Sequence, residues 1–327
     1  MTQTNVYRNL NKETIQKIKK RRLTVIVSII IVVVILVADI ILVVTKSNDV
    51  IFKSNTTETL EITQSGTKLN PIIVDGNGGT AQCIKVEGNY VTVRNFVVEN
   101  CESHAILILG NNVIVENNTV RNSVTENGKG ECFTEGSWGS GIKLGLGSHD
   151  VTVRGNKVHE NCGEGIASTR SFNVLIENNQ VWDNFSVGIY VDNSYNVKVS
   201  NNLVYCTGVY LRDGKRPNGI AFAEESYEGW GLQRRDNSAV NNKVNGCNTG
   251  IASWESEEET GKEVRLLIEG NQVFNTTGRS IELNTVNEDV IVKNNISDKP
   301  AFVRHPEGVT LVENIEDVAT PFSQTSP

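Results

Sequence analysis

The sequence predicts an all-β protein, a single-stranded parallel β-helix of about nine coils preceded by one N-terminal transmembrane helix. Three observations lead to this prediction. A unit of strand, turn and strand recurs every 22 to 24 residues, and some copies are longer. Seven copies carry an Asn at the same position of the turn. Outside one apolar segment near the N-terminus, no stretch has the periodicity of an amphipathic helix.

The apolar segment Leu23–Val44 predicts a membrane anchor. Its 22 residues, each adding about 1.5 Å in a helix, can cross a hydrocarbon core of about 30 Å. A basic cluster at residues 17–22 precedes it, so residues 1–22 are expected in the cytoplasm and the β-helix on the extracellular or periplasmic side. A cleavable signal peptide is the alternative, but the apolar run is long and no Ala-x-Ala site follows it.

Charge and cysteine usage agree with this division. Residues 1–46 have a net charge of +6 and the remainder −13, which argues against a nucleic-acid partner. All six Cys lie beyond the apolar segment, where disulfides persist. Cys206 and Cys247 occupy near-equivalent places in adjacent copies, which predicts a disulfide. Cys132 can reach Cys101 or Cys162, and small buried thiols are the alternative for these residues.

The repeat divides the rest of the chain. After a polar linker at residues 45–59, the β-helix is expected over 60–312 and a tail over 313–327. The first strands of the copies are centred on Val93, Val115, Val153, Ile176, Val199, Ala239, Ile268 and Val292. Three residues later stand Asn118, Asn156, Asn179, Asn202, Asn242, Asn271 and Asn295. Asn suits a sharp turn, and amides stacked at one turn can bond along the array.

A further strand in each copy, here named the Gly-Ile strand, carries Ile142, Ile166, Ile189, Ile220 or Ile251 after a Gly. Together with the Asn-rich turn and the leading segment 72–76, Ile-Ile-Val-Asp-Gly, this strand resembles the right-handed parallel β-helix repeat proteins. Pectate lyases and related polysaccharide lyases share that fold. The resemblance covers about residues 60–312 and implies a substrate groove along the Gly-Ile strands. Many functions are built on this fold, so activity must be argued from the site.

The longer copies locate the functional face. Their extra residues fall between Val120 and Ile142, Val204 and Ile220, Phe222 and Ala239, and Ser253 and Ile268. Each of these insertions enters or leaves a Gly-Ile strand, whereas the Asn turn is never lengthened. Loops concentrated on one face of a solenoid usually mark its binding side.

Alternation along the Gly-Ile strands identifies the outward side chains. The predicted catalytic residues are Lys143, Arg170 and Tyr190, and the predicted substrate-binding residues are Trp138, Trp254, Asp192 and Glu164. Of these, Arg170 comes just after the outward positions of its strand, and Trp138 and Glu164 are expected in the loops that lead into the strands. Small, aromatic and ionisable residues together suit a sugar-binding trough. The alternative for each charged residue is a solvated strand position or an ion pair with a neighbour.

The resemblance implies chemistry that begins with removal of the proton beside a uronic acid carboxylate. Lys143, Arg170 or Tyr190 would take the proton, and Asp192 and Glu224 would hold Ca²⁺ against the carboxylate. The leading hypothesis is a membrane-anchored protein that binds a polysaccharide outside the cytoplasm and cleaves or epimerises it, with the lipid bilayer as a second partner through residues 23–44.

Two other functions stay open. A non-catalytic module for glycan binding, adhesion or spacing needs only the anchor, the β-helix and an aromatic face. A glycoside hydrolase needs two carboxyl groups, for which Asp192 and Glu224 qualify. The hydrolase ranks below the lyase or epimerase because the Gly-Ile strands carry no Gly-Asp-Asp type pair such as β-helical polygalacturonases have.

Overall fold

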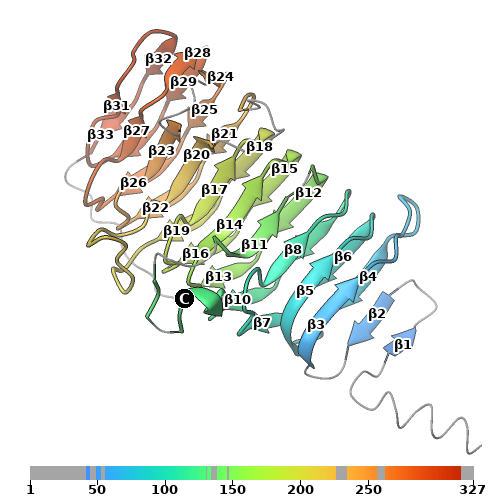
Figure 1. Ribbon diagram of the computed structural model, residues 1–327. Coiled ribbons are helices and arrows are strands. Elements are labelled where there is room, and N and C mark those ends of the chain that lie inside the picture. The colour runs from blue at the N-terminus through green and yellow to red at the C-terminus, as the bar shows by residue number, and fades with distance from the viewer. Residues whose placement is uncertain are drawn as a thin grey trace, which may run out of the picture. The chain divides into compact units, whose positions relative to one another are not determined.

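The computed structural model describes residues 42–44, 49–52, 56–129, 131–133, 138–145, 147–225, 234–255 and 262–317. Residues 43–327 make up one compact unit, whose described part is a parallel β-helix (Figure 1). The strands of successive coils pair in parallel. The all-β parallel fold predicted from the repeat is therefore confirmed.

Each coil contributes strands to three rows. The first row, a 12-stranded sheet, comprises β1 (Leu42–Val44), β2 (Asp49–Phe52), β4 (Ile72–Asp75), β6 (Val91–Arg94), β9 (Ile114–Glu116), β12 (His149–Arg154), β15 (Phe172–Glu177), β18 (Tyr195–Ser200), β21 (Ser238–Val240), β25 (Leu267–Glu269), β29 (Val290–Lys293) and β32 (Val309–Val312). The second row, which follows the Asn turn, comprises β7 (Val97–Glu99), β10 (Thr119–Arg121), β13 (Lys157–His159), β16 (Gln180–Trp182), β19 (Leu203–Tyr205), β22 (Lys243–Asn245), β26 (Gln272–Phe274), β30 (Ile296–Ser297) and β33 (Ile315–Glu316).

The third row contains the Gly-Ile strands. It comprises β3 (Thr56–Ile62), β5 (Thr80–Val86), β8 (Ile106–Ile108), β11 (Ser140–Leu144), β14 (Glu164–Thr169), β17 (Ile189–Asp192), β20 (Ile220–Glu224), β23 (Ile251–Glu255), β27 (Ile281–Leu283) and β31 (Phe302–Val303). Because β5 pairs with both β7 and β8, the second and third rows join there. Outside the rows lie a 3₁₀ turn (Thr125–Asn127) and the pair β24 (Lys262–Val264) and β28 (Val286–Glu288).

Inward and outward side chains alternate along the strands of the third row, as the sequence predicts. Ile142, Ile166 and Ile189 stand in register on neighbouring strands and are fully buried. The Gly before each Ile is required by close approach of the coils. A Cβ on Gly188 would lie 2.7 Å from the carbonyl oxygen of Gly219, so no side chain fits there. The next position along each strand faces outward, and these positions build the floor of the site.

The Asn residues form a buried ladder. The side-chain amide of Asn179 donates to Asn202 Oδ1 at 3.0 Å, and Asn179 Oδ1 accepts from the backbone and side chain of Asn156. The same bonds continue from Asn118 to Asn314. The left-handed backbone conformation belongs to the residue before each ladder Asn, such as Asn178 at φ 55°. The first of the two Asn therefore makes the turn, and the second bonds the coils together.

Replacing a ladder Asn is expected to destabilise the protein. In Asn179→Ala, the backbone N–H of Asn156 and the carbonyl of Val153 each lose a buried partner, and the side-chain amide of Asn156 loses one of its acceptors. We expect the free energy of unfolding to fall by about 2–4 kcal/mol, measured by denaturant unfolding. Gln180→Ala, a change at the next and half-buried residue, should cost less than about 0.5 kcal/mol. Equal losses in the two variants would show that the ladder has no special role.

The ends of the β-helix differ from the expected boundaries. Strand β2 and the first part of β3 lie within residues 45–59, which were expected to be a linker, and β33 lies within the expected tail. Residues 23–41 of the predicted anchor lie outside the described residues, and Leu42–Val44 form β1. In the part of the chain that the structure describes, no helix has the length and apolar character needed to cross a bilayer.

Three disulfides join neighbouring coils. Cys206 and Cys247, the pair that the sequence favours, are bonded with their Cα atoms 4.8 Å apart. Cys132, for which two partners were open, is bonded to Cys162. The third bond joins Cys83 to Cys101, so no cysteine is free. The disulfides of Cys132 and Cys206 fasten insertions that border the third row.

Candidate functional site

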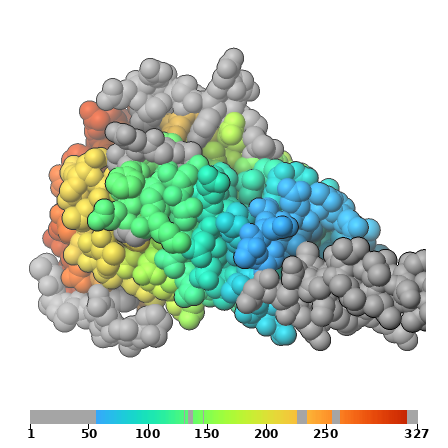
Figure 2. Space-filling model, turned by 60° about the horizontal axis from the view of Figure 1, so that its bottom comes forward, coloured from blue at the N-terminus to red at the C-terminus, as the bar shows by residue number. Residues whose placement is uncertain are grey.

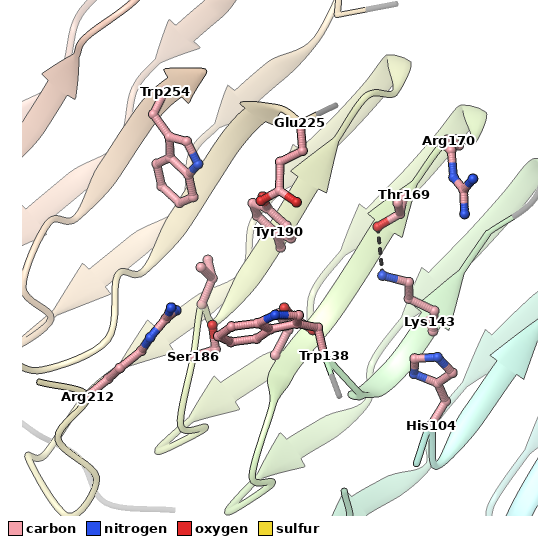
Figure 3. A pocket seen from close by; sticks show the side chains of 12 residues that line it. His104, Trp138, Lys143, Thr169, Arg170, Ser186, Tyr190, Arg212, Glu225 and Trp254 are labelled. Carbon is pink, nitrogen blue, oxygen red and sulfur yellow. Dashed lines mark hydrogen bonds between the residues drawn. The ribbon is translucent and has the colours of Figure 1, made fainter. Parts of the chain in front are cut away.

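A groove of about 440 Å³ lies on the outer face of the third row and crosses five successive strands, from β11 to β23. Its lining includes six of the predicted site residues: Trp138, Lys143, Glu164, Arg170, Tyr190 and Trp254. Figure 3 shows that Lys143, Tyr190 and Trp254 reach the groove from separate coils. The insertions form one wall, because Arg212 stacks on the ring of Trp138 at 4.4 Å. In Figure 2, green and yellow parts of the surface lie next to each other, in agreement with this contact.

Lys143 is held at one end of the groove. It points outward from β11, and its Nζ donates to Thr169 Oγ1 on the next strand at 2.8 Å (Figure 3). Arg170 follows Thr169 with φ 53°, in the left-handed region that costs a non-glycine residue about 1 kcal/mol. This turn brings a guanidinium beside an ammonium on the same wall. The end of the groove is therefore cationic and suited to a carboxylate.

His104 lies beside Lys143 (Figure 3). The backbone N–H of Ser140 donates to His104 Nδ1 at 3.1 Å, so the neutral ring carries its proton on Nε2. Burial, followed by the charge of Lys143, lowers the pKa of His104 to about 4. The imidazole is therefore neutral at pH 7 and offers a hydrogen-bond donor.

The lowered pKa of His104 predicts that the stability of the protein depends on pH. Its pKa is about 4 in the folded protein, against 6.5 for an unperturbed His, so between these values the unfolded chain binds more protons. The free energy of unfolding should then fall as the pH is lowered through this window. His104→Gln should remove about 2 kcal/mol of the decrease between pH 7 and pH 5, measured by denaturant unfolding. Exposed His305 provides the control variant, His305→Gln, and a parent-like slope in His104→Gln would contradict the assignment.

Glu164 and Tyr190 form the buried centre of the groove. Glu164 accepts a hydrogen bond from Ser140 Oγ at 2.8 Å, and burial raises its pKa despite the nearby charge of Lys143. Tyr190 donates its hydroxyl to Glu225. Burial and the charges of Asp192 and Glu225 hold the pKa of Tyr190 well above its usual value. Tyr190 therefore keeps its proton and is a hydrogen-bond or proton donor.

Aromatic rings provide apolar surface at the other end. Tyr190 and Trp254 stack with ring centres 5.7 Å apart. Beneath them, Ala167, Ala221 and Ala252 form a small apolar cluster with Val187. Small residues leave room above the floor, and the rings give flat platforms of the kind used by sugar-binding sites.

The prediction that Asp192 and Glu224 face a ligand in the groove is wrong. Asp192 occupies an outward position of β17 but is fully buried. Glu224 is also buried, and its carboxylate accepts bonds from the backbone N–H of Arg234 and the amide of Asn193. Neither residue lines the groove.

Glu224 instead belongs to a buried charge cluster behind Trp254. Arg234 Nε lies 2.9 Å from Glu263 and 4.0 Å from Glu224, and Arg234 Nη1 donates to the carbonyl of Trp254. Burial raises the pKa of Glu263 to about 7, although Arg234 opposes the shift. Two carboxyl groups thus share one guanidinium, which fixes the backbone that carries Trp254.

These placements do not fit the Ca²⁺ site that the resemblance implies. A calcium ion needs several convergent oxygen ligands, whereas Glu224 faces Arg234 and Asn193, and Glu164 accepts from Ser140. Within the described residues, no three His, Cys, Asp or Glu side chains are grouped to hold a metal ion. We therefore derive no step through Ca²⁺.

The structure adds groove residues that the sequence analysis missed: His104, Thr169, Ser186, Val187, Arg212 and Glu225. Alternation identifies Glu225, because it has the outward parity of Ala221 and Ala223, whereas Glu224 has the inward parity of Ile220. Thr169 has the same outward register as Asp192. No sequence signal places Arg212, which lies within an insertion.

Comparisons with known proteins agree with the architecture. A family model described as the right handed beta helix region matches residues 40–224 and 168–261. No curated protein matches the sequence. Among solved structures, pectate lyase Pel9A is 14% identical with a TM-score of 0.53, over 85% of this chain and 72% of that chain.

A rhamnogalacturonan lyase is 13% identical with a TM-score of 0.52, over 83% of this chain and 77% of that chain. The A-module of the mannuronan C-5 epimerase AlgE4 of Azotobacter vinelandii is 13% identical with a TM-score of 0.46, over 79% of this chain and 84% of that chain. At these identities the likeness shows the fold alone.

Proposed function

The chain belongs to the right-handed β-helix family, and we propose that it binds an acidic polysaccharide along the groove and cleaves or epimerises it. The observation that carries this proposal is the cationic end of the groove, where Lys143, Arg170 and neutral His104 meet. The part of the chain after residue 46 has a net charge of −13. Cations gathered in the groove of an acidic protein favour an anionic ligand.

Two further observations support a polysaccharide as the substrate. The groove crosses several coils, so it accommodates an extended chain, and Trp138 and Trp254 provide apolar platforms. Two solved structures of similar fold are a pectate lyase and a rhamnogalacturonan lyase. We therefore propose a uronate-containing glycan.

The proposed reaction begins at Lys143. In its uncharged form, Lys143 takes the C5 proton of a uronate whose carboxylate is bound by Arg170. In a lyase, the C5–H electron pair forms the C4=C5 double bond while the C4–O4 bond breaks, and Tyr190 donates a proton to the leaving oxygen. In an epimerase, the C4–O4 bond stays intact and Tyr190 instead donates its proton to C5 on the opposite face. Solvent water then restores the protonation of Lys143 and Tyr190.

The other two predicted bases suit different roles. Arg170 keeps its charge, because an Arg guanidinium does not deprotonate in proteins, so it binds the carboxylate. The raised pKa of Tyr190 disfavours the tyrosinate form that a base requires, so Tyr190 suits the proton donor. Of the three predicted catalytic residues, Lys143 is thus the one that fits the base.

A panel of glycans tests the proposal. The full chain would be incubated with galacturonan, alginate and rhamnogalacturonan in D₂O. A lyase gives unsaturated products that absorb in the ultraviolet, and an epimerase incorporates deuterium at C5, detected by NMR. Neither signal with any glycan would exclude the proposed chemistry, and binding without turnover would favour a non-catalytic module.

A glycoside hydrolase is the second candidate, and it involves a different carboxyl pair from the one predicted. Glu164 has a raised pKa, as a general acid requires, and Glu225 lines the same groove. New reducing ends without unsaturation or deuterium at C5 would favour it.

We also propose that the apolar segment 23–44 anchors the protein with the β-helix outside the cytoplasm. Its length and the basic cluster before it support this location, and three disulfides fit an oxidising compartment. Fractionation of cells would test it, and recovery of the intact chain without membranes would contradict it.

A further inference from the structure

A short hairpin borders the groove beside Trp138. Arg212 and Lys215 pair through two backbone hydrogen bonds of 2.8 and 2.9 Å. The residues between them, Asp213 and Gly214, have φ 50° and 73°. Positive φ at both central positions defines a type I′ turn, and Asp-Gly is among its preferred sequences. The hairpin therefore presents Arg212 and Lys215 on a rigid backbone.

The base of the hairpin is fastened to the β-helix. The disulfide between Cys206 and Cys247 lies just before it in the chain. The guanidinium of Arg216 donates to the carbonyls of Gly246 and Cys206, and the disulfide Sγ of Cys206 lies 3.6 Å from the carbonyl oxygen of Pro217. The cations of the hairpin are therefore fixed relative to the third row.

The charges of this hairpin are not balanced within the described residues. Arg212 and Lys215 are cross-strand partners, and like charges placed opposite each other destabilise a strand pair. Arg216 adds a third cation, against the single carboxylate of Asp213, which also lines the hollow described below. Among the ion pairs of the described residues, none involves these three side chains. An anion bound between them would relieve the repulsion.

A hollow of about 290 Å³ lies under these cations. It shares Ser186, Val187, Arg212 and Trp254 with the groove, so the two spaces adjoin. Lys215 and Arg216 line only the hollow. A glycan bound at Lys143 can therefore extend past Trp254 towards the hairpin.

We propose that Arg212, Lys215 and Arg216 form a second anion subsite, which binds a carboxylate or sulfate group further along the same glycan chain. This inference rests on the proposed function and specifies its substrate. The glycan carries anionic groups on at least two units, one at Lys143 and Arg170 and one at the hairpin.

Calorimetric binding to the full chain tests the subsite with three probes: tetragalacturonate, its uncharged methyl ester and dextran sulfate oligomers. Lys215→Gln should weaken binding of the anionic probe about 3- to 10-fold, between the effect of an exposed ion pair and that of a charge-assisted hydrogen bond. Binding of the methyl ester should not change. Lys198→Gln, an equal charge change at an exposed residue of β18, should match the parent.

Each outcome decides the proposal. Preference for tetragalacturonate or for dextran sulfate identifies the bound group as a carboxylate or a sulfate. Parent-like binding by Lys215→Gln overturns the subsite and leaves the groove proposal standing. Equal affinity of the parent for the charged and the esterified probe contradicts both the subsite and the binding of a carboxylate at Lys143 and Arg170. A Lys215 effect without turnover by the parent supports the subsite and removes the catalytic proposal. Absence of binding to every probe contradicts both.

Discussion

Replacing Lys143 with Ala is expected to lower turnover of the acidic glycan by about 10²- to 10⁴-fold, the usual contribution of a general base. Lys143 Nζ is the amine in the groove, held by Thr169, so no neighbouring group that we describe replaces it in proton transfer. Binding should weaken much less, because Arg170 and the aromatic rings remain. The measurement is the steady-state rate, with kcat and KM determined separately.

Two variants serve as controls for Lys143. Lys85 occupies the same outward register two strands earlier, through Leu107, and pairs with Glu87. Lys85→Ala removes the same charge from the same face and should keep parent-like activity. Lys143→Arg keeps the charge but not the base, so it should bind and fail to turn over. Full activity in Lys143→Ala would contradict the assigned base.

Replacing Arg234 with Met is expected to cost about 3–5 kcal/mol of unfolding free energy, the usual effect of removing one partner from a buried ion pair. The change leaves Glu224 and Glu263 buried without their shared cation. It also removes the donor to the carbonyl of Trp254, so glycan affinity should fall as well. Denaturant unfolding gives the first quantity, and calorimetry the second.

The neighbouring Arg235 provides the control for this prediction. Its guanidinium lies over the ring of Tyr195 at 4.1 Å and is half-buried, so Arg235→Met should cost less than about 1 kcal/mol. In Arg234→Met/Glu263→Leu, removal of one buried carboxylate should restore part of the lost stability. A loss in Arg234→Met no larger than that in Arg235→Met would show that the cluster does not support the groove.

The strands and their register could be predicted because they depend on local alternation. Ile142 and Ile166 face the core for the same reason that Lys143 faces outward. The first strands of the β-helix were harder to predict from the sequence. β3 is mostly exposed and rich in Thr and Glu, because a terminal coil has fewer neighbours to cover it, and its sequence therefore resembles a linker.

The candidate site was only partly predictable, because burial on the outer face depends on insertions. Alternation correctly gives Tyr190 and Asp192 the same side of β17, yet Asp192 is covered completely and Tyr190 contacts the groove. The contact between Trp138 and Arg212 joins two insertions far apart in the sequence. No repeat pattern specifies such a contact, so Arg212 and its hairpin emerge only from the structure.

The central claim is that the glycan binds on the outer face of the third row. Oxidative footprinting of tryptophan in the full chain, with and without bound tetragalacturonate, tests it most directly. Trp138 and Trp254 line the groove, whereas Trp182 stacks between His159 and Tyr205 on the second row. We expect the glycan to protect Trp138 and Trp254 and to leave Trp182 unchanged. Protection of Trp182 alone, or unchanged oxidation at Trp138 and Trp254 under saturating glycan, would contradict the claim.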